Sequence, residues 1–207
     1  MKNKVVIIGV AGGSGSGKTR LVKNTLLALS DTKTTSIEVD SYYKDLSHLP
    51  FKEREKNNFD HPDAIDFELL YQDLKKLLKN EVIYCPIYNY KTHTREKNKS
   101  VKIEKVKIII LEGILALHDA KIRELMAMKI FVDTPSDVRL LRRIKRDVNK
   151  RGRTIENITE QYNKTVKPMF LKFVEPTKEY ADIIVPKGGK NKISIDAIVT
   201  NIKKMYI

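Results

Sequence analysis

The feature that most constrains the fold is an apolar run at residues 5–10 that leads directly into a glycine-rich loop. Glycines allow the backbone to turn successive N–H groups inward around an anion. An amphipathic pattern follows the loop and predicts a helix whose N-terminus favours the same anion. In this arrangement the lysine reaches the outer phosphates and the threonine hydroxyl ligates Mg²⁺. The sequence therefore predicts a nucleoside triphosphate site, whereas a glycine-rich turn with an incidental lysine would need neither flanking element. The predicted phosphate loop consists of Gly12, Gly13, Ser14, Gly15, Ser16, Gly17, Lys18 and Thr19.

Strand-like and helical patterns alternate along the rest of the chain. Such alternation predicts an α/β fold with a five-stranded parallel sheet and helices on both faces. Strands are expected at 4–10, 35–39, 106–111, 128–132 and 182–185. Helices are expected at 17–30, 66–79, 119–126, 135–149, 155–180 with a break near Pro168 or Pro176, and 192–205.

One segment, residues 81–104, does not fit the alternation. It contains two extended stretches around a polar turn expected at 94–99, which predicts an inserted hairpin that builds a lid or substrate pocket. The chain has 207 residues and no linker or composition break. We therefore expect a single domain over 1–207, with this hairpin as an insertion.

Composition excludes several protein classes. Hydrophobic residues make up 41% of the chain and charged residues 32%, as in soluble globular proteins. The apolar runs are too short to span a bilayer, and the N-terminus lacks a secretory signal pattern, so we expect a cytoplasmic protein without membrane contact. Cys85 is the single cysteine, which rules out an intrachain disulfide.

The chain is strongly basic, with 40 Lys and Arg against 26 Asp and Glu, a net charge of +14. Such a charge raises the possibility of nucleic-acid binding. Most of the excess is scattered lysine, however, and the one dense cluster has a helical period without interleaved aromatic residues. We therefore expect no nucleic-acid partner.

Acidic residues directly follow three of the expected strands, where ligands of parallel sheets bind. Asp40 follows the second strand, Glu112 the third and Asp133 the fourth. A carboxylate beside a triphosphate holds Mg²⁺, directly or through water, or accepts the proton of an attacking hydroxyl. We expect Asp40 to be the base, Glu112 to serve Mg²⁺, and Asp133 to be a helix N-cap or turn residue.

The basic run at 139–153 combines an apolar face with a second stripe of Arg139, Arg142, Arg143, Arg146 and Lys150. Guanidinium groups on such a helix suit a lid that closes over a triphosphate and stabilises the migrating charge. The alternative is a solvated basic helix.

Two further segments contain candidate binding residues. Asn58–Asp66 resembles a turn leading into a helix capped by Asp66 or Asp63. In the second segment, Tyr88, Tyr90 and His93 suit a heterocyclic base, although each is more often structural when it stands alone.

Together these segments resemble the uridine kinase (uridine–cytidine kinase) family of P-loop kinases, in the family's order and over nearly the whole length. The matching segments are Gly-Gly-Ser-Gly-Ser-Gly-Lys-Thr (12–19), Asp-Ser-Tyr-Tyr-Lys-Asp (40–45), Asn-Phe-Asp-His-Pro-Asp-Ala (58–64), Pro-Ile-Tyr-Asn-Tyr-Lys-Thr-His-Thr-Arg (86–95), Leu-Glu-Gly-Ile-Leu (111–115), Arg-Arg-Ile-Lys-Arg-Asp (142–147), Arg-Gly-Arg (151–153) and Glu-Gln-Tyr (160–162). The resemblance implies the three-layer P-loop NTPase fold and transfer of the γ-phosphate of ATP or GTP to the 5′-hydroxyl of uridine or cytidine in pyrimidine salvage.

The resemblance also implies roles for individual residues. Asp40 would act on the hydroxyl, and Thr19 and Glu112 would serve Mg²⁺, with Asp40 also near the metal. Arg146 and Arg151 would meet the phosphates together with Lys18. The nucleoside would be bound by Tyr43, Phe59, Asp60, Tyr88, Tyr90, His93, Ile114, Arg143, Arg153 and Gln161. The family implies a homotetramer and feedback inhibition by CTP or UTP.

Three positions depart from the family pattern, and two rival functions remain. Asn89 and Tyr90 stand where the family usually has Asp and Phe, and Arg20 replaces a frequent Thr or Ser. One rival is another small-molecule kinase, of the phosphoribulokinase or pantothenate kinase type. The other is an NTP-dependent nucleic-acid-binding switch. The segment Asn191-Lys192-Ile193-Ser194 argues against a GTPase of this kind, because it lacks the Asp of the guanine-reading motif.

Overall fold

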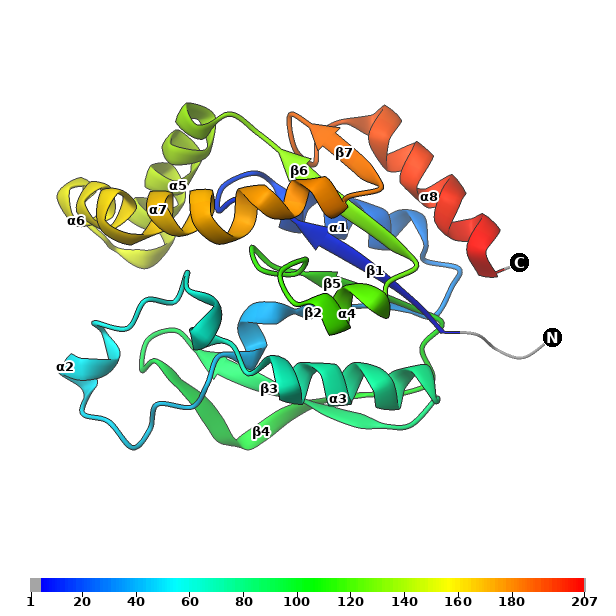
Figure 1. Ribbon diagram of the computed structural model, residues 1–207, viewed down its shortest axis with the longest axis horizontal. Helices are drawn as coiled ribbons and strands as arrows, with labels where there is room; N and C mark the ends of the chain where they lie inside the picture. Colours follow the sequence, from blue (N-terminus) through cyan, green and yellow to red (C-terminus); the bar gives the residue numbers. More distant parts are fainter. Residues whose placement is uncertain (1–4, 207) are drawn as a thin grey trace.

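A five-stranded parallel sheet forms the centre of the computed structural model, which describes residues 5–206 (Figure 1). The strands lie in the order β2-β5-β1-β6-β7, so β1 is central. The five predicted strands are confirmed as these five, although Lys4, the first residue of one prediction, lies outside the described residues. The strands are β1 (Val6–Ala11), β2 (Thr34–Glu38), β5 (Ile108–Glu112), β6 (Met128–Asp133) and β7 (Ile183–Pro186).

Parallel pairing brings the carboxyl ends of all five strands to one edge of the sheet. Ile8 of β1 is in register with Ile110 of β5 and with Met128 of β6, so the central strand is held on both sides. The chain goes from β1 towards one side of the sheet and later returns to the other side, a topology that opens a crevice beyond the end of β1.

Helices cover both faces of the sheet, as predicted. One face is covered by α1 and α8, and the other by α3 and α4, as the buried clusters on the two faces show. The main helices are α1 (Lys18–Ala28), α2 (Phe51–Arg54), α3 (Phe67–Leu78), α4 (Ala120–Glu124), α5 (Ser136–Arg151), α6 (Ile155–Gln161), α7 (Lys167–Met169) and α8 (Lys192–Tyr206). Among residues 5–206, no helix is long and apolar enough to cross a bilayer.

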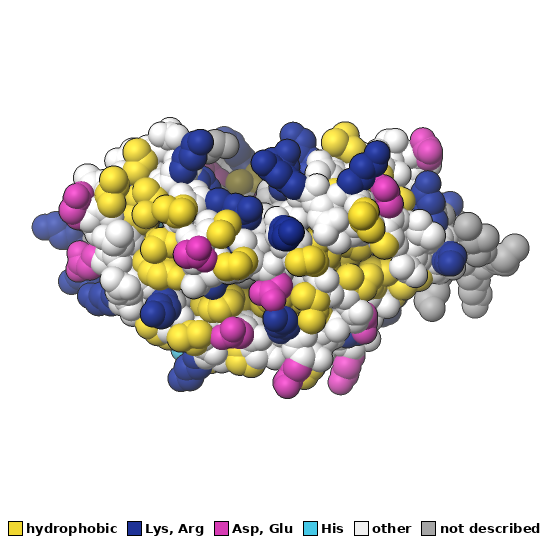
Figure 2. Space-filling model, turned by 90° about the horizontal axis from the view of Figure 1, so that it is seen from above, with side chains coloured by type: hydrophobic (Ala, Val, Ile, Leu, Met, Phe, Trp, Pro, Cys, Tyr) yellow, Lys and Arg dark blue, Asp and Glu magenta, His cyan; other side chains and the backbone are white. Residues whose placement is uncertain are grey.

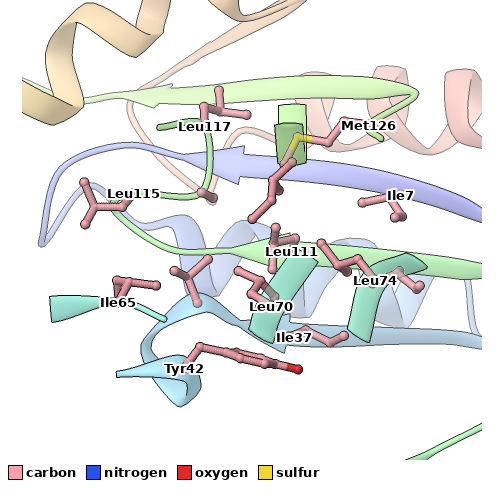
Figure 3. Packing of buried hydrophobic residues seen from close by; sticks show 14 of the residues in the cluster. Ile7, Ile37, Tyr42, Ile65, Leu70, Leu74, Leu111, Leu115, Leu117 and Met126 are labelled. Atoms are coloured by element: carbon pink, nitrogen blue, oxygen red, sulfur yellow. The ribbon is translucent and has the colours of Figure 1, made fainter. Parts of the chain in front are cut away.

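The alternation of side chains along β1 builds two separate hydrophobic cores. Ile8 packs into the cluster beneath α1 and α8, while Ile7 packs into the cluster beneath α3. Figure 3 shows the second cluster, in which Leu70 and Leu74 of α3 lie over the sheet. Because β1 is buried on both faces, it is a rigid support for the loop that follows it.

The predicted hairpin insertion is present as a separate antiparallel pair, β3 (Ile83–Asn89) and β4 (Thr94–Ile103). The turn predicted at 94–99 is wrong, because the chain turns at residues 90–93. The Asn89 carboxamide accepts hydrogen bonds from the N–H groups of Lys91 and Thr92 at 2.9 and 3.3 Å, which stabilises the turn there. The polar residues after it form a mostly exposed strand, whose composition resembles that of a loop.

The predicted long helix at 155–180 is interrupted, as expected from its prolines. Two π-helical turns, η3 (Tyr162–Val166) and η4 (Phe170–Val174), flank Pro168 in α7, and a 3₁₀ turn, η5 (Glu175–Tyr180), contains Pro176. Proline has no N–H and its ring clashes with the preceding turn of an α-helix. The wider and narrower turns accommodate both prolines without ending the segment.

The prediction that Asp133 is a helix N-cap or turn residue is wrong. Asp133 is the last residue of β6, and its carboxylate accepts a hydrogen bond of 2.5 Å from Lys178 of η5. Pro135 precedes α5 instead, and proline is well suited to the start of a helix. The cap predicted at Asp66 is confirmed, because its carboxylate accepts a bond from the N–H of Leu69 at 3.1 Å.

Candidate active site

The phosphate loop, residues 12–19, connects the buried end of β1 to the start of α1. Gly15 and Gly17 have φ angles of 80° and 101°, a conformation that a side chain disfavours, and the N–H of Ser16 bonds to the carbonyl of Gly13 at 3.0 Å. Backbone N–H groups in such turns, next to the positive end of the α1 dipole, favour an anion. The loop is therefore a preformed anion site.

A glycine pair after β7 packs directly on the phosphate loop. A Cβ atom on Gly188 would lie 2.4 Å from the carbonyl oxygen of Ser16, and Gly188 has a φ of 76°. The side chain of Asn24 in α1 bonds to the carbonyl of Gly189 at 2.9 Å. Sequence reasoning missed this contact, although two adjacent glycines shortly after the last predicted strand are a recognisable signal for a close backbone approach.

Lys18 is buried in the loop, and its ammonium group bonds to the carbonyl of Gly13 at 3.2 Å. Burial lowers the pKa of Lys18 to about 8, although Glu112 and Asp40 oppose the shift. Because this value still lies above neutral pH, Lys18 is mostly charged and is available to a phosphate.

Thr19 and Glu112 form the predicted metal-binding pair. The Thr19 hydroxyl donates a 3.0 Å hydrogen bond to the Glu112 carboxylate. Burial raises the pKa of Glu112, opposed by the bond from Thr19 and by the charge of Lys18. A hydroxyl and a buried carboxylate are the hard oxygen ligands that Mg²⁺ prefers, so these residues fit the cation.

Asp40 lies in a 3₁₀ turn, η1 (Val39–Tyr42), that follows β2 directly. Burial raises the pKa of Asp40 to about 6, although the nearby Lys18 opposes the shift and Glu38 and Asp60 add to it. A carboxylate with this pKa is ionised at neutral pH and is a better proton acceptor than an exposed aspartate.

Five predicted nucleoside-binding residues form one aromatic cluster. The centroid of the Tyr43 ring lies 5.1 Å from that of Phe59 and 5.0 Å from that of Tyr88. His93 stacks on Phe59 at 5.0 Å, and Tyr90 lies edge-on to Tyr88 at 5.5 Å. The Tyr88 hydroxyl is buried and makes no hydrogen bond with the described part of the chain.

Three further predicted residues form a hydrogen-bonded chain that links α5 and α6 to the phosphate loop. Arg143 donates to the Ser14 hydroxyl at 3.0 Å and to the Gln161 side chain at 2.8 Å, and Arg153 donates to the same Gln161 oxygen at 2.7 Å. Burial raises the pKa of Asp60, and the charge of Arg143 opposes this shift. The remaining predicted residue, Ile114, packs against the core cluster beside α3.

Arg146 and Arg151 surround an acid that sequence reasoning missed. Asp147 is fully buried, and its carboxylate accepts a bond from Arg146 at 2.7 Å and forms an ion pair with Arg151 at 3.6 Å. Arg151 also lies over the ring of Tyr90 at 6.0 Å, which places the end of α5 beside the hairpin. The signal was the spacing of Asp147, four residues from both Arg143 and Arg151.

Part of the predicted basic stripe is structural. Arg139 is buried, with its guanidinium 3.8 Å from the Phe170 ring and bonded to the carbonyl of Thr134 at 3.0 Å. Arg142 donates to the carbonyl of Ser16 at 3.2 Å. The side chain of Lys150 lies outside the described part. Arg139 and Arg142 therefore help to pack α5 against the phosphate loop.

A second residue missed by sequence reasoning, Arg95, connects the hairpin to the segment that follows Asp40. Its guanidinium donates to the carbonyls of Tyr43 and Tyr42 at 2.7 and 3.1 Å and pairs with Asp66 at 3.3 Å. The arginine therefore fixes the aromatic cluster to the turn η1.

These groups lie at one edge of the sheet, where β1 points and where α5, α6, α2 and the hairpin lie (Figure 1). An anion site, a lysine, a hydroxyl–carboxylate pair and a carboxylate of raised pKa are the parts that phosphoryl transfer requires. The aromatic cluster lies on the side of Asp40 and supplies flat apolar surfaces. The arrangement therefore suits transfer of a phosphoryl group to a ring-containing acceptor.

Comparison with known proteins agrees with this chemistry. Residues 7–194 match the model of the phosphoribulokinase/uridine kinase family. A protein of Geobacillus sp. (strain WCH70) named "Uridine kinase" is 52% identical over 203 residues, which are 98% of this chain and 96% of that protein. A "Uridine kinase" of Salmonella paratyphi B is 52% identical over 209 residues, 99% of this chain and 97% of that protein.

Among solved structures, phosphoribulokinase from Rhodobacter spheroides has a TM-score of 0.67 and 17% identity, over 89% of this chain and 71% of that one. D-Glycerate 3-kinase from Cryptococcus neoformans has a TM-score of 0.62 and 16% identity, over 82% and 79% of the two chains. At such identities these structures share the fold alone. The sequence relatives reach further, and with the family model they show that this chain is a kinase of the phosphoribulokinase/uridine kinase family.

Proposed function

We propose that this kinase transfers the γ-phosphate of ATP or GTP to the 5′-hydroxyl of uridine or cytidine, giving UMP or CMP in pyrimidine salvage. The observation that carries the proposal is the aromatic cluster next to Asp40, at the end of a strand beside the phosphate loop. Relatives of about 50% identity over nearly the whole chain bear the name "Uridine kinase", which supports the same substrate class.

The phosphate loop binds the triphosphate through its backbone N–H groups, and Lys18 neutralises the outer phosphates. Mg²⁺ would be held by the Thr19 hydroxyl and the Glu112 carboxylate, with Asp40 as a further acidic group near the metal. The bound cation would supply positive charge that offsets the negative charge of the phosphates during transfer. Residues of this chain do the remaining work of positioning.

Asp40 orients the attacking hydroxyl and accepts its proton. The 5′-oxygen forms a bond to the γ-phosphorus, the bond between that phosphorus and the β–γ bridging oxygen breaks, and ADP or GDP leaves with the bond electrons. Proton loss comes late in a dissociative transition state, so orientation is the larger contribution. Asp60 and Arg143 hold the ribose hydroxyls and thereby align the 5′-oxygen.

The aromatic cluster binds the pyrimidine. Tyr43, Phe59 and Tyr90 present ring faces and edges, while the imidazole of His93 and the buried Tyr88 hydroxyl, which has no hydrogen-bond partner within residues 5–206, hydrogen-bond the base edge. Arg153 and Gln161 close the pocket from the lid side, and Ile114 contributes an apolar wall. The substitutions Asn89 and Tyr90 change the polarity of the hairpin rather than the catalytic groups.

Arg146 and Arg151 stabilise charge on the phosphoryl group as it moves. Their side chains project from the last turns of α5. These turns and Arg153 belong to the lid, which consists of residues 139–153. The lid and the hairpin at 81–104 belong to a single domain over 1–207. The protein is a cytoplasmic homo-oligomer, a tetramer by family resemblance, and is inhibited by CTP or UTP.

Nucleic acid is not a partner in this proposal. Figure 2 shows Lys and Arg side chains spread over the face of the molecule seen from above, with hydrophobic and acidic side chains between them. A protein surface that binds a polynucleotide typically has a continuous basic stripe. RNA that bound at physiological salt and stimulated ATP hydrolysis would contradict the proposal.

An assay of coupled ADP release with a panel of acceptors tests the proposal. We expect turnover with uridine and cytidine, and none with ribulose 5-phosphate or pantothenate. The same assay on Asp40→Asn should show a kcat lower by orders of magnitude with nearly unchanged ATP affinity. Turnover that depends on ribulose 5-phosphate or pantothenate, and not on uridine, would assign the chain to another member of the family.

A further inference from the structure

Asp147, to which the proposed mechanism assigns no role, lies at the centre of a cluster of four arginines. Its side chain has no solvent exposure, although four guanidinium groups lie within 4 Å of its carboxylate. Burial alone would raise the pKa of Asp147, but Arg146, Arg151 and Arg143 together hold it below the usual range. The carboxylate is therefore ionised and is the counter-charge of the cluster.

The two oxygens of this carboxylate contact two different pairs of arginines. Oδ1 accepts a bond from Arg146 at 2.7 Å and lies 3.6 Å from Arg151, the pair proposed for the phosphates. Oδ2 lies 3.7 Å from Arg143 and 3.9 Å from Arg153, the pair proposed for the nucleoside. One side chain thus joins the donor side of the site to the acceptor side.

The contacts on the two oxygens differ in strength. Within the described part of the chain, Oδ2 of Asp147 and Nε of Arg143 make no hydrogen bond, although they are an ion pair 3.7 Å apart. Because that distance exceeds a hydrogen bond, a shift of Arg143 by less than 1 Å would form a strong charge-assisted bond. Oδ1 is already bonded to Arg146. Because the carboxylate is rigid, a shorter contact between Oδ2 and Arg143 also changes the position of Oδ1 and therefore of Arg146.

Both Oδ2 partners are also held by one neutral group. The side-chain oxygen of Gln161 accepts bonds from Arg143 at 2.8 Å and from Arg153 at 2.7 Å. Arg143 also donates a hydrogen bond of 3.0 Å to the hydroxyl of Ser14 in the phosphate loop. The acceptor pair therefore moves as a unit, and Asp147 is its ionic connection to the donor pair.

We propose that Asp147 is a positioning residue that couples nucleoside binding to triphosphate binding, by holding the donor pair and the acceptor pair of arginines on its two carboxylate oxygens. This inference rests on the proposed function. A nucleoside that orders Arg143 and Arg153 also orders Arg146 and Arg151, so the second ligand binds a site whose ordering is already complete. The coupling is reciprocal by thermodynamic necessity.

The test is the coupling factor between the two ligands, measured by calorimetry. Uridine is titrated into the protein alone and into the protein saturated with a nonhydrolysable ATP analogue and Mg²⁺. We expect uridine to bind about 10-fold more tightly to the wild-type complex, within the usual range of coupling. In Asp147→Asn we expect the factor to fall below about 2, while the affinity for each ligand alone changes less than about 3-fold, because the amide keeps a hydrogen bond to Arg146.

Asp137→Asn is the matched control, since it removes the same charge from an exposed position on the same helix. Its coupling factor should equal that of the wild type. Unchanged coupling in Asp147→Asn, or wild-type coupling of 1, would overturn the inference while uridine phosphorylation stands. A wild-type enzyme that neither binds nor phosphorylates uridine would instead overturn the proposed function.

A second variant decides the question if Asp147→Asn does not fold. Asp147→Glu keeps the charge and displaces the carboxylate by one methylene, so it does not hold both pairs at their present distances. We expect its coupling factor to fall at least about 3-fold with a melting temperature near that of the wild type. Full wild-type coupling in Asp147→Glu would refute the role of the two-sided contact.

Discussion

Asp40→Asn should stabilise the folded protein while it removes activity. The pKa of Asp40 is about 6 in the folded chain against 3.8 for an ordinary aspartate, a difference of about 2 pKa units. Each unit is about 1.4 kcal/mol, so ionised Asp40 lowers the free energy of unfolding by at most about 3 kcal/mol at neutral pH. The neutral amide does not carry this cost.

Lys18 reduces the expected gain. Its ammonium group is favoured by the nearby Asp40 charge, and its pKa, about 8 already, falls further in the variant. We therefore expect a net stabilisation of about 1–2 kcal/mol, which for a chain of this size raises the melting temperature by about 3–6 °C.

The pH dependence gives the prediction its sign. Because the folded-state pKa of Asp40 lies above its unfolded value, the destabilisation is complete above pH 6 and disappears as the pH falls towards 4. Thermal melts of wild type and Asp40→Asn, without nucleotide and in the presence of a chelator, should therefore differ at pH 7.5 and converge near pH 4. A variant that melts at or below the wild-type temperature at pH 7.5, or a difference independent of pH, would refute the reasoning.

Three other substitutions test separate parts of the site. Glu112→Gln removes the charge beside Thr19 and should raise the Mg²⁺ concentration for half-maximal rate about 10-fold. A Mg²⁺ titration with an assay of ADP release measures this concentration. An unchanged Mg²⁺ requirement would show that Glu112 is not part of the metal site. Gly188→Ala places a methyl group 2.4 Å from the Ser16 carbonyl and should weaken ATP analogue binding about 10-fold or more by calorimetry, and unaltered affinity would contradict the tight backbone approach. Tyr88→Phe removes a buried hydroxyl that has no hydrogen-bond partner in the described part of the chain, so the melting temperature should stay within about 2 °C while the KM for uridine rises about 10-fold; a loss of stability with normal KM would reverse this assignment.

Much of the fold follows from local patterns in the sequence. The β-branched runs predicted five strands because each is buried on both faces or at one edge of a parallel sheet, and the glycines of 12–17 predicted the loop that the structure contains. The turn of the hairpin was misplaced because β4 is exposed, and a strand without a buried face lacks the hydrophobic alternation that identifies strands. Its turn depends instead on the side chain of Asn89.

The candidate site was predictable where motifs name residues and unpredictable where residues act through contacts between distant segments. The stripe on α5 was predicted as one surface, yet Arg139 faces Phe170 in the interior while Arg146 faces a buried acid. A helical period gives the face of a helix but does not say what covers it. Asp133 was misassigned for the same reason, since its partner Lys178 is 45 residues away.

The packing of Gly188 and Gly189 on the phosphate loop has a consequence for synthesis of the chain. The loop spans residues 12–19, whereas the two glycines that pack on it belong to a segment far along the chain, after β7. A ribosome-bound chain that stops before β7 thus carries the glycine-rich motif without the segment that closes it. Such a chain lacks the contact between Gly188 and the Ser16 carbonyl and should bind a nucleotide more weakly than a chain that contains both glycines.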